Sequence, residues 1–228
     1  MANEWKAVTK KAVIWDMDGV IVDTEAYHFG AWRKRLQEEG IEFTENDFKR
    51  TFGMRNPEII RTILGEDVTE DVIRRLADGK EEYFRQFVSG NLMALPGAVD
   101  LMKGLREGGF LQAVASSAPK QNIELVMRSL EISRFFPCLV SGDEVSAGKP
   151  DPQIFLLAAK RLGVEPRKCV VIEDSVAGVQ AAVTGGMKCV AVATTHPPER
   201  LVPADIVVAS LERIKATDIA GLVVERRP

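Results

Sequence analysis

The stretch Ala12-Val13-Ile14-Trp15-Asp16-Met17-Asp18-Gly19 is an apolar strand pattern that ends in two carboxylates. Side chains two apart on a strand point the same way, so we expect Asp16 and Asp18 to face one ligand, and Gly19 lets the chain turn sharply after them. An Asp carboxylate can attack phosphorus and form an acyl phosphate while a second carboxyl group moves protons. The stretch therefore predicts a site of phosphoryl transfer, and two anions beside a phosphate require a cation.

Length and composition set the broad class of the protein. The chain has 228 residues, of which 46% are hydrophobic, enough for one large domain or two modest ones. Its net charge of -3 argues against a nucleic-acid or anionic-membrane surface, because no basic excess exists to release counterions. No apolar run approaches the roughly 20 residues that span a bilayer. We expect a cytoplasmic protein without nucleic-acid or membrane partners; the oligomeric state stays open, with a monomer favoured.

Cysteine and histidine patterns exclude several other site types. The three cysteines, Cys138, Cys169 and Cys189, lie inside apolar runs without CxxC spacing, so we expect reduced core residues. His28 and His196 are too far apart in the sequence to form a zinc-type cluster, and no GxSxG elbow occurs. Neither GxGxxG nor GxxxxGK[ST] is present, so nucleotide-dependent chemistry receives little support.

Strand and helix patterns alternate through most of the chain. The expected strands, several apolar almost throughout, are Lys11–Asp16, Phe110–Ser116, Pro137–Ser141, Lys168–Glu173, Lys188–Ala193 and Asp205–Ala209. The expected helices between them are Ala98–Glu107, Gln121–Leu130, Pro152–Leu162 and Val176–Thr184. Fully apolar strands that alternate with helices predict a parallel sheet covered on both faces, in a doubly wound α/β fold.

Helix signals alone fill the interval from about residue 24 to 92. We expect helices at Glu25–Glu39, between Pro57 and Gly65, and at Thr69–Val88. This interval predicts a small helical domain, residues 25–92, inserted into a core domain of residues 1–24 and 93–228. Ligands bind at the carboxyl edge of open α/β sheets, so the insertion would act as a lid over the two aspartates.

Three further motifs follow the expected strands. Ser116 and Ser117 end one strand and could contact phosphate oxygens and substrate, although such residues are more often turn or cap residues. Lys149 lies in a proline-stiffened loop and could hold a phosphate, although a lone lysine is usually solvated. Glu173 and Asp174 follow another strand and supply hard oxygen ligands for Mg²⁺, or merely cap the next helix.

Together these motifs resemble the signature of a known superfamily. The ordered set is Asp16-Met17-Asp18-Gly19-Val20-Ile21-Val22-Asp23-Thr24, then Ser116, then Gly148-Lys149-Pro150-Asp151-Pro152, then Ile172-Glu173-Asp174-Ser175. It resembles the four motifs of the haloacid dehalogenase superfamily, over essentially the whole chain. The insertion is similar to the small α-helical cap of that superfamily, and the likeness is greatest to its β-phosphoglucomutase-like phosphatase branch. The resemblance implies a Rossmann-like core.

The resemblance also implies roles for individual residues. Asp16 would be the nucleophile, and Asp18 would protonate the leaving oxygen and then deprotonate the incoming water or hydroxyl. Ser116 and Lys149 would hold the transferring phosphoryl oxygens. The Mg²⁺ ligands would be Asp16, the Asp18 carbonyl, Glu173 and Asp174.

Asp18 and several residues of the insertion help to distinguish a dehalogenase, a phosphatase and a mutase. Dehalogenases lack an acid at position 18, so Asp18 implies a phosphatase or a mutase. His28 resembles the mutase histidine that gates the acid/base aspartate, although it could simply pack in the insertion. Gly53 and Arg55 resemble the mutase loop that binds a non-reacting phosphate, but the arginine arrives one position early. Lys80 is expected to be a solvated helix lysine.

These observations favour a Mg²⁺-dependent phosphohydrolase of small sugar or polyol phosphates that works through an aspartyl-phosphate. The first alternative is a β-phosphoglucomutase, which would return the phosphoryl group to a sugar phosphate instead of water. A remote alternative is a binding protein on an inactive scaffold, which the complete set of signature residues disfavours. The expected partner is a small phosphorylated metabolite.

Overall fold

The computed structural model describes residues 10–224, so residues 1–9 and 225–228 of the predicted core domain lie outside the described part of the chain. Six parallel strands form one sheet in the order β3-β2-β1-β4-β5-β6. The strands are β1 Ala12–Trp15, β2 Leu111–Ser116, β3 Cys138–Ser141, β4 Cys169–Glu173, β5 Lys188–Val192 and β6 Ile206–Val208. The predicted parallel, doubly wound sheet is confirmed, with strand ends that differ from the expected ones by at most one residue.

Strand β1 lies in the middle of the sheet because its side chains suit burial on both faces. All four residues from Ala12 to Trp15 are fully buried. Val13 and Trp15 pack into the hydrophobic cluster on one face, and Ala12 and Ile14 into the cluster on the other. A central strand of a parallel sheet requires this nearly continuous apolar run.

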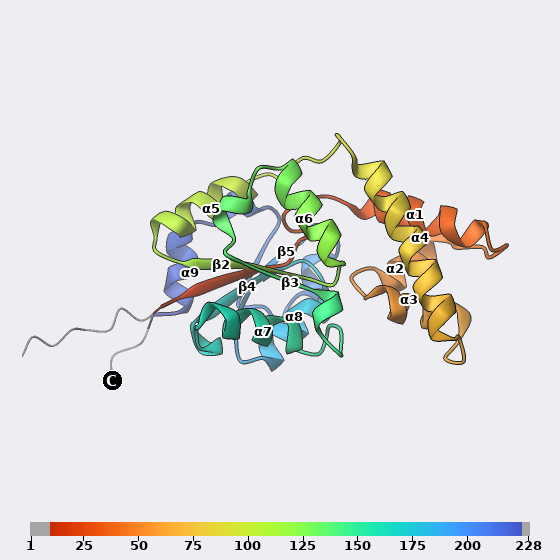
Figure 1. Cartoon of the computed structure of the whole chain (residues 1–228). Coiled ribbons are helices and arrows are strands. Elements are labelled where there is room, and N and C mark those ends of the chain that lie inside the picture. Colours follow the sequence, from red (N-terminus) through yellow and green to blue (C-terminus); the bar gives the residue numbers. More distant parts are fainter. Residues whose placement is uncertain (1–9, 225–228) are drawn as a thin grey trace, which may run out of the picture.

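Helices cover both faces of the sheet (Figure 1). One face is covered by α5 (Ala98–Glu107), α6 (Lys120–Ser129) and α9 (Ala216–Leu222). The other is covered by α7 (Gln153–Leu162) and α8 (Val176–Thr184). The sequence patterns predicted four of these helices; the short α9 was missed because its seven residues span barely two turns of apolar periodicity.

The remaining four helices lie beside the carboxyl ends of the strands (Figure 1). They are α1 (Glu25–Gln37), α2 (Glu45–Thr51), α3 (Asn56–Leu64) and α4 (Glu70–Val88). Their apolar faces meet in a hydrophobic cluster of their own, which includes Trp32, Phe48 and Leu76. We call this segment, residues 25–92, the helical insertion. Its own cluster is the physical reason why four consecutive helices hold together beside the sheet rather than on it.

The three cysteines agree with the expectation of reduced core residues. Cys138, Cys169 and Cys189 are buried and free. Burial raises the pKa of Cys169 to about 12, which keeps its thiol protonated and unreactive. Within residues 10–224, no helix is both long and apolar enough to cross a membrane.

Candidate active site

The strand register brings the sequence motifs together at one edge of the sheet. Trp15 is level with Val114 of β2 and Ile172 of β4. The backbone N–H of Asp16 donates to the Ile172 carbonyl at 2.9 Å, which continues the β1–β4 ladder by one residue. Asp16 therefore lies beside Glu173. Register alone explains why side chains more than 150 residues apart in the sequence are neighbours.

Gly19 is needed where the chain leaves β1. Its φ is +79°, in the left-handed region that favours glycine, and a Cβ atom there would lie 2.1 Å from an Asp174 Oδ2 oxygen. The hydroxyl of Thr194 donates to the Gly19 carbonyl at 2.5 Å and holds this turn against the loop after β5. The turn can thus approach the β4 carboxylates closely only without a side chain.

Lys149 lies between two carboxylates of the sheet edge. Its Nζ donates to Asp16 Oδ1 at 2.5 Å and also to Glu173 Oε1. All three side chains are buried. Burial disfavours the ammonium, but the two carboxylates outweigh this and raise the pKa of Lys149 above its usual value. The lysine is therefore a fixed positive charge at the end of β1.

Three buried carboxylates form a possible metal site. Asp16, Glu173 and Asp174 each offer an oxygen, and these atoms lie within 4.8 Å of one another. The other Glu173 oxygen accepts from the backbone N–H groups of Asp174 at 2.8 Å and Ser175 at 2.7 Å, which fixes its orientation. Three carboxylates against the one charge of Lys149 leave a surplus of two negative charges. Hard oxygen donors with that surplus fit a divalent cation such as Mg²⁺.

The protonation of this cluster reflects the charge surplus. Burial, together with the negative charges of Glu173 and Asp18, raises the pKa of Asp16 to about 8 despite the opposing effect of Lys149. Burial and the neighbouring Glu173 and Asp16 likewise hold the pKa of Asp174 well above its usual range. The Thr195 hydroxyl donates to Asp174 and works in the opposite direction. A cation at this position would restore both carboxylates to the ionised form.

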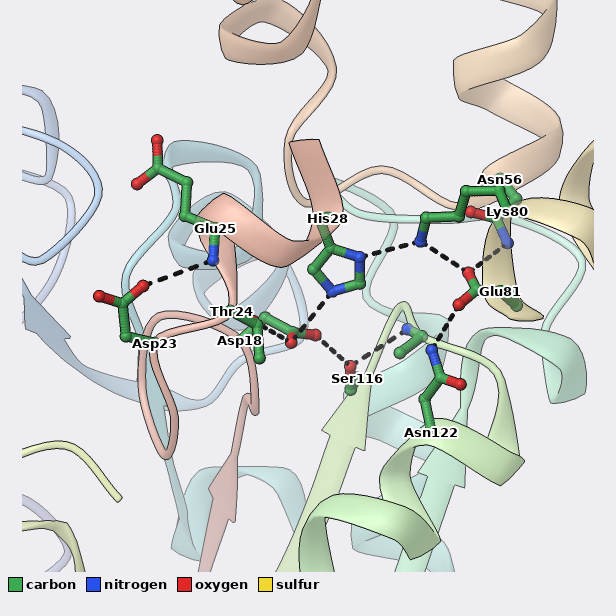
Figure 2. A network of polar contacts seen from close by, with 11 residues as sticks. Asp18, Asp23, Thr24, Glu25, His28, Asn56, Lys80, Glu81, Ser116 and Asn122 are labelled. Atoms are coloured by element: carbon green, nitrogen blue, oxygen red, sulfur yellow. Dashed lines mark hydrogen bonds and ion pairs between the residues drawn. The ribbon is translucent and has the colours of Figure 1, made fainter. Parts of the chain in front are cut away.

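Asp18 has a different environment, in a network of polar contacts that reaches into the helical insertion (Figure 2). Its Oδ1 accepts from the Thr24 hydroxyl at 2.5 Å and lies 3.3 Å from His28 Nε2; its Oδ2 lies 3.5 Å from the Ser116 hydroxyl. Although burial works to raise it, the pKa of Asp18 is lowered by the neighbouring His28, by the hydrogen bond from Thr24 and by the charge of Lys80. The pKa values of these two aspartates, two residues apart, are therefore shifted in opposite directions.

The prediction that Lys80 is solvated is wrong. The residue is only 2% exposed. Its Nζ lies 2.9 Å from His28 Nδ1 and 2.8 Å from Glu81 Oε1 (Figure 2). An ammonium can only donate, so His28 Nδ1 accepts and the Nε2 proton points at Asp18. The lysine is inside because it belongs to the apolar stripe of α4, four residues from both Leu76 and Phe84.

Glu81 extends this network across to the core. Its Oε2 accepts from the side-chain amide of Asn122 on α6 at 2.5 Å, and its Oε1 accepts from Asn56 at 2.7 Å. Burial opposes ionisation of Glu81, but the charge of Lys80, the neighbouring His28 and the hydrogen bonds from Lys80 and Asn56 outweigh it and lower the pKa of the carboxyl group. Figure 2 shows a continuous chain of polar contacts from Ser116 through Asp18 and His28 to Asn122.

Side chains from both the sheet edge and the insertion line one cavity of about 50 Å³. The residues predicted as site residues that line it are Asp16, Asp18, His28, Gly53, Ser116, Ser117, Lys149 and Asp174. Apolar side chains of the insertion, Trp32, Phe48 and Phe52 among them, form much of the opposite wall. Glu173 lies directly behind the cavity, in contact with Lys149.

Arg55 is the predicted site residue that the structure turns away from the cavity lining. Its guanidinium donates to Glu58 in the first turn of α3 and to the backbone carbonyls of Val145, at 2.7 Å, and Ser146, at 3.0 Å. The shift by one position in the loop after Gly53 thus points the arginine at the core backbone.

Several polar residues of the site were not predicted as site residues, and the sequence signals for them differ in strength. The position of Lys80 within the i, i+4 stripe of α4 was a readable signal for burial, and Glu81 follows it directly. Thr24 lies in the quoted first motif without a role. Thr195 lies in a loop between β5 and β6, where no periodicity reveals direction.

Comparisons with known proteins identify the family of the chain and support its fold. Residues 10–186 match the haloacid dehalogenase-like hydrolases. A phosphorylated carbohydrates phosphatase of Thermotoga maritima is 34% identical over 182 residues, which cover 78% of this chain and 82% of the relative. The β-phosphoglucomutase of Bacillus subtilis is 35% identical over 205 residues, 87% of this chain and 88% of the relative.

A solved structure agrees closely in shape. The crystal structure of a β-phosphoglucomutase from Clostridium difficile superposes with a TM-score of 0.86 at 30% sequence identity. The superposition covers 94% of this chain and 97% of that one, so it includes both the sheet and the helical insertion.

Proposed function

Because the chain belongs to the haloacid dehalogenase-like hydrolases, a family of enzymes, we propose that it hydrolyses phosphate monoesters of small sugars or polyols through an aspartyl-phosphate on Asp16. One observation carries the proposal: Asp16 and Asp18 reach the same cavity, the first against Lys149 and the second against Thr24 and His28. One carboxylate beside a fixed cation and one within a proton-exchanging network suit the roles of nucleophile and acid/base.

The proposed reaction has two displacements. An Asp16 oxygen attacks phosphorus, and the ester oxygen leaves with a proton from Asp18. Asp18 then removes a proton from water, which attacks the aspartyl-phosphate and releases phosphate. The low pKa of Asp18 suits the second step. The first step needs its proton, and an approaching phosphate dianion favours proton uptake because a like charge raises the pKa of a carboxyl group.

Three groups would position the transferring phosphoryl oxygens. Lys149 supplies a fixed charge, and the Ser116 hydroxyl lies at the same sheet edge. Mg²⁺ held by Asp16, Glu173, Asp174 and the Asp18 carbonyl would neutralise charge on the phosphate when bound. The surplus of two negative charges supports this cofactor, and the family relationship agrees with it.

The helical insertion would act as a mobile cap. A cavity of about 50 Å³ holds a few water molecules, whereas sites for small ligands usually measure roughly 300 Å³ or more. A sugar phosphate therefore enters only after the insertion, residues 25–92, moves away from the sheet edge. Closure would then exclude bulk water from the reacting phosphate.

A mutase is the second candidate, and one observation favours it: an insertion histidine, His28, contacts the acid/base Asp18. Another observation disfavours it. Within residues 10–224, the basic side chains that line the cavity are His28, Lys80 and Lys149, and each already has a polar partner. A second phosphate would need a further cation, because a bisphosphate intermediate carries both groups into the cavity. The charge balance favours substrates with one phosphate.

Phosphorus NMR tests the proposal directly. The protein is incubated with Mg²⁺, β-glucose 1-phosphate and a trace of the 1,6-bisphosphate, and then with a panel of sugar and polyol phosphates. We expect inorganic phosphate, loss of the signal with EDTA, and none from Asp16→Asn. Accumulation of glucose 6-phosphate would instead establish the mutase. Phosphate release that persists in Asp16→Asn would remove the nucleophile assignment.

A further inference from the structure

Arg55 and Glu58 form a two-part contact between the helical insertion and one loop of the core. Arg55 precedes α3 and donates from its guanidinium to the carbonyls of Val145 and Ser146. Glu58, one turn along, accepts from the backbone N–H of Gly148 at 3.2 Å. The two side chains also pair with each other, at 2.6 Å between Arg55 Nη2 and Glu58 Oε1. Together they satisfy three backbone groups of residues 145–148.

The loop that they hold leads directly into Lys149. On its core side, the loop is held by one side chain, Gln153 at the start of α7, whose Oε1 accepts from the backbone N–H groups of Ser146 at 2.7 Å and Ala147 at 3.1 Å. The insertion supplies three further side-chain hydrogen bonds to this loop: two from Arg55 to the carbonyls and one from Gly148 to Glu58. Residues 145–148 are thus clamped between the core helix α7 and the insertion.

Gly148 is shaped for this contact. A Cβ atom there would lie 2.6 and 2.7 Å from the two Glu58 carboxylate oxygens and 3.0 Å from Arg55 Nε. A side chain at position 148 would therefore displace the Glu58 carboxylate from the Gly148 backbone, next to the lysine that contacts Asp16. Because Gly148 lies one peptide bond from Lys149, a displacement of the loop backbone displaces the lysine.

We propose that Arg55 and Glu58 are positioning residues that couple closure of the insertion to the placement of Lys149. When the insertion closes, the pair captures the three backbone groups and fixes the loop; when it opens, the loop loses three hydrogen bonds and retains Gln153. Lys149 would reach its full effect on the phosphoryl group only in the closed state. The proposal rests on the proposed function for the role of Lys149, but the contact itself does not.

A fluorescence measurement tests the contact without turnover. Dyes are placed on cysteines introduced at two exposed positions, Glu66 in the insertion and Glu199 in the core; the native cysteines are buried. Energy transfer is recorded without ligand and with Mg²⁺ and inorganic phosphate. Arg55→Ala and Gly148→Ala should both shift the protein toward lower transfer, because one removes the donors and the other blocks the approach.

Arg61→Ala is the matched control. Arg61 also lies on α3 and pairs with a glutamate, Glu70 at 2.5 Å, but that pair stays within the insertion. It should leave the energy transfer unchanged. If Arg55→Ala and Gly148→Ala also leave it unchanged, the proposed coupling is wrong. An inactive wild-type protein would refute the proposed function, whereas the fluorescence result would still decide the contact.

Kinetics with p-nitrophenyl phosphate separate positioning from a purely structural role. Arg55→Ala should lower kcat about 10- to 100-fold, as expected for lost hydrogen bonds from a charged donor, with a much smaller change in KM. Arg55→Lys should recover part of the rate because one donor remains, and Glu58→Gln retains an acceptor for Gly148. The Arg55→Ala, Gly148→Ala double variant should be no worse than the poorer single one. Additive losses, or a loss of stability with normal kcat, would overturn the coupling.

Discussion

Lys149 of the core and Lys80 of the helical insertion are both buried lysines, yet their surroundings differ. Lys149 contacts Asp16 and Glu173, and Asp174 adds a third buried carboxylate to that cluster. Lys80 contacts one carboxylate, Glu81, and the ring of His28. The core cluster thus carries surplus negative charge, whereas the insertion cluster is balanced. A cluster whose charges balance can stabilise the closed packing by itself. A cluster with surplus negative charge needs a bound cation, which can then also bind a phosphate.

Removal of the core lysine should have the largest effect on activity and tests the difference between the two lysines directly. Lys149→Met keeps the length and apolar stem of the side chain but removes the charge that faces the phosphate. We expect kcat for p-nitrophenyl phosphate to fall about 1,000-fold, the size of effect seen when a preorganised charge stabiliser is lost. Circular dichroism serves as the control for folding. A rate within tenfold of the wild type would mean that Lys149 does not act on the phosphoryl group.

The same substitution in the insertion should have a smaller effect. In Lys80→Met, His28 loses the donor that fixes its tautomer, so the proton facing Asp18 is no longer assured. We expect kcat to fall about 10- to 100-fold, in the range of general acid–base effects. Lys49→Met, at an exposed lysine of the same insertion, should be neutral. Equal losses in Lys80→Met and Lys149→Met would remove the distinction between a positioning lysine and a phosphate-binding one.

The two regions also differ in how much the sequence reveals. Asp16 and Glu173 follow strands of one parallel sheet, so register brings them together whatever covers the sheet. This is why the core fold and its candidate residues could be predicted. The direction of a helix side chain depends on how the helix packs, so Lys80 was taken as solvated and Arg55 as a phosphate ligand. Contacts made by the loop residue Thr195 depend on tertiary structure alone.

The smallest predicted effect is a change in stability, and it tests the charge balance of the core cluster. Asp174→Asn removes one of the three clustered carboxylates and keeps an oxygen that can accept from Thr195. In EDTA at pH 7, it should raise stability by about 1 kcal/mol, equivalent to roughly 2–4 °C in Tm for a chain of this size, while abolishing Mg²⁺ binding. Differential scanning calorimetry and isothermal titration measure the two effects.

Glu81→Gln is the matched change in the balanced cluster, and its effect should have the opposite sign. Because the pKa of Asp174 is raised, the folded wild type keeps a proton on this carboxyl group that the unfolded chain releases above pH 3.8. Ionisation therefore favours the unfolded state as pH rises from about 4, and the stability gained by Asp174→Asn grows over the same range. Because the pKa of Glu81 is lowered, its ionised carboxylate stabilises the fold above pH 4.5, and this contribution is lost as pH falls through the pKa of the folded state. Glu81→Gln should therefore reduce the free energy of unfolding at pH 7 and change it little in acid. If both variants lose stability equally at pH 7, the core cluster carries no surplus charge, and the argument for a divalent cation there fails with it.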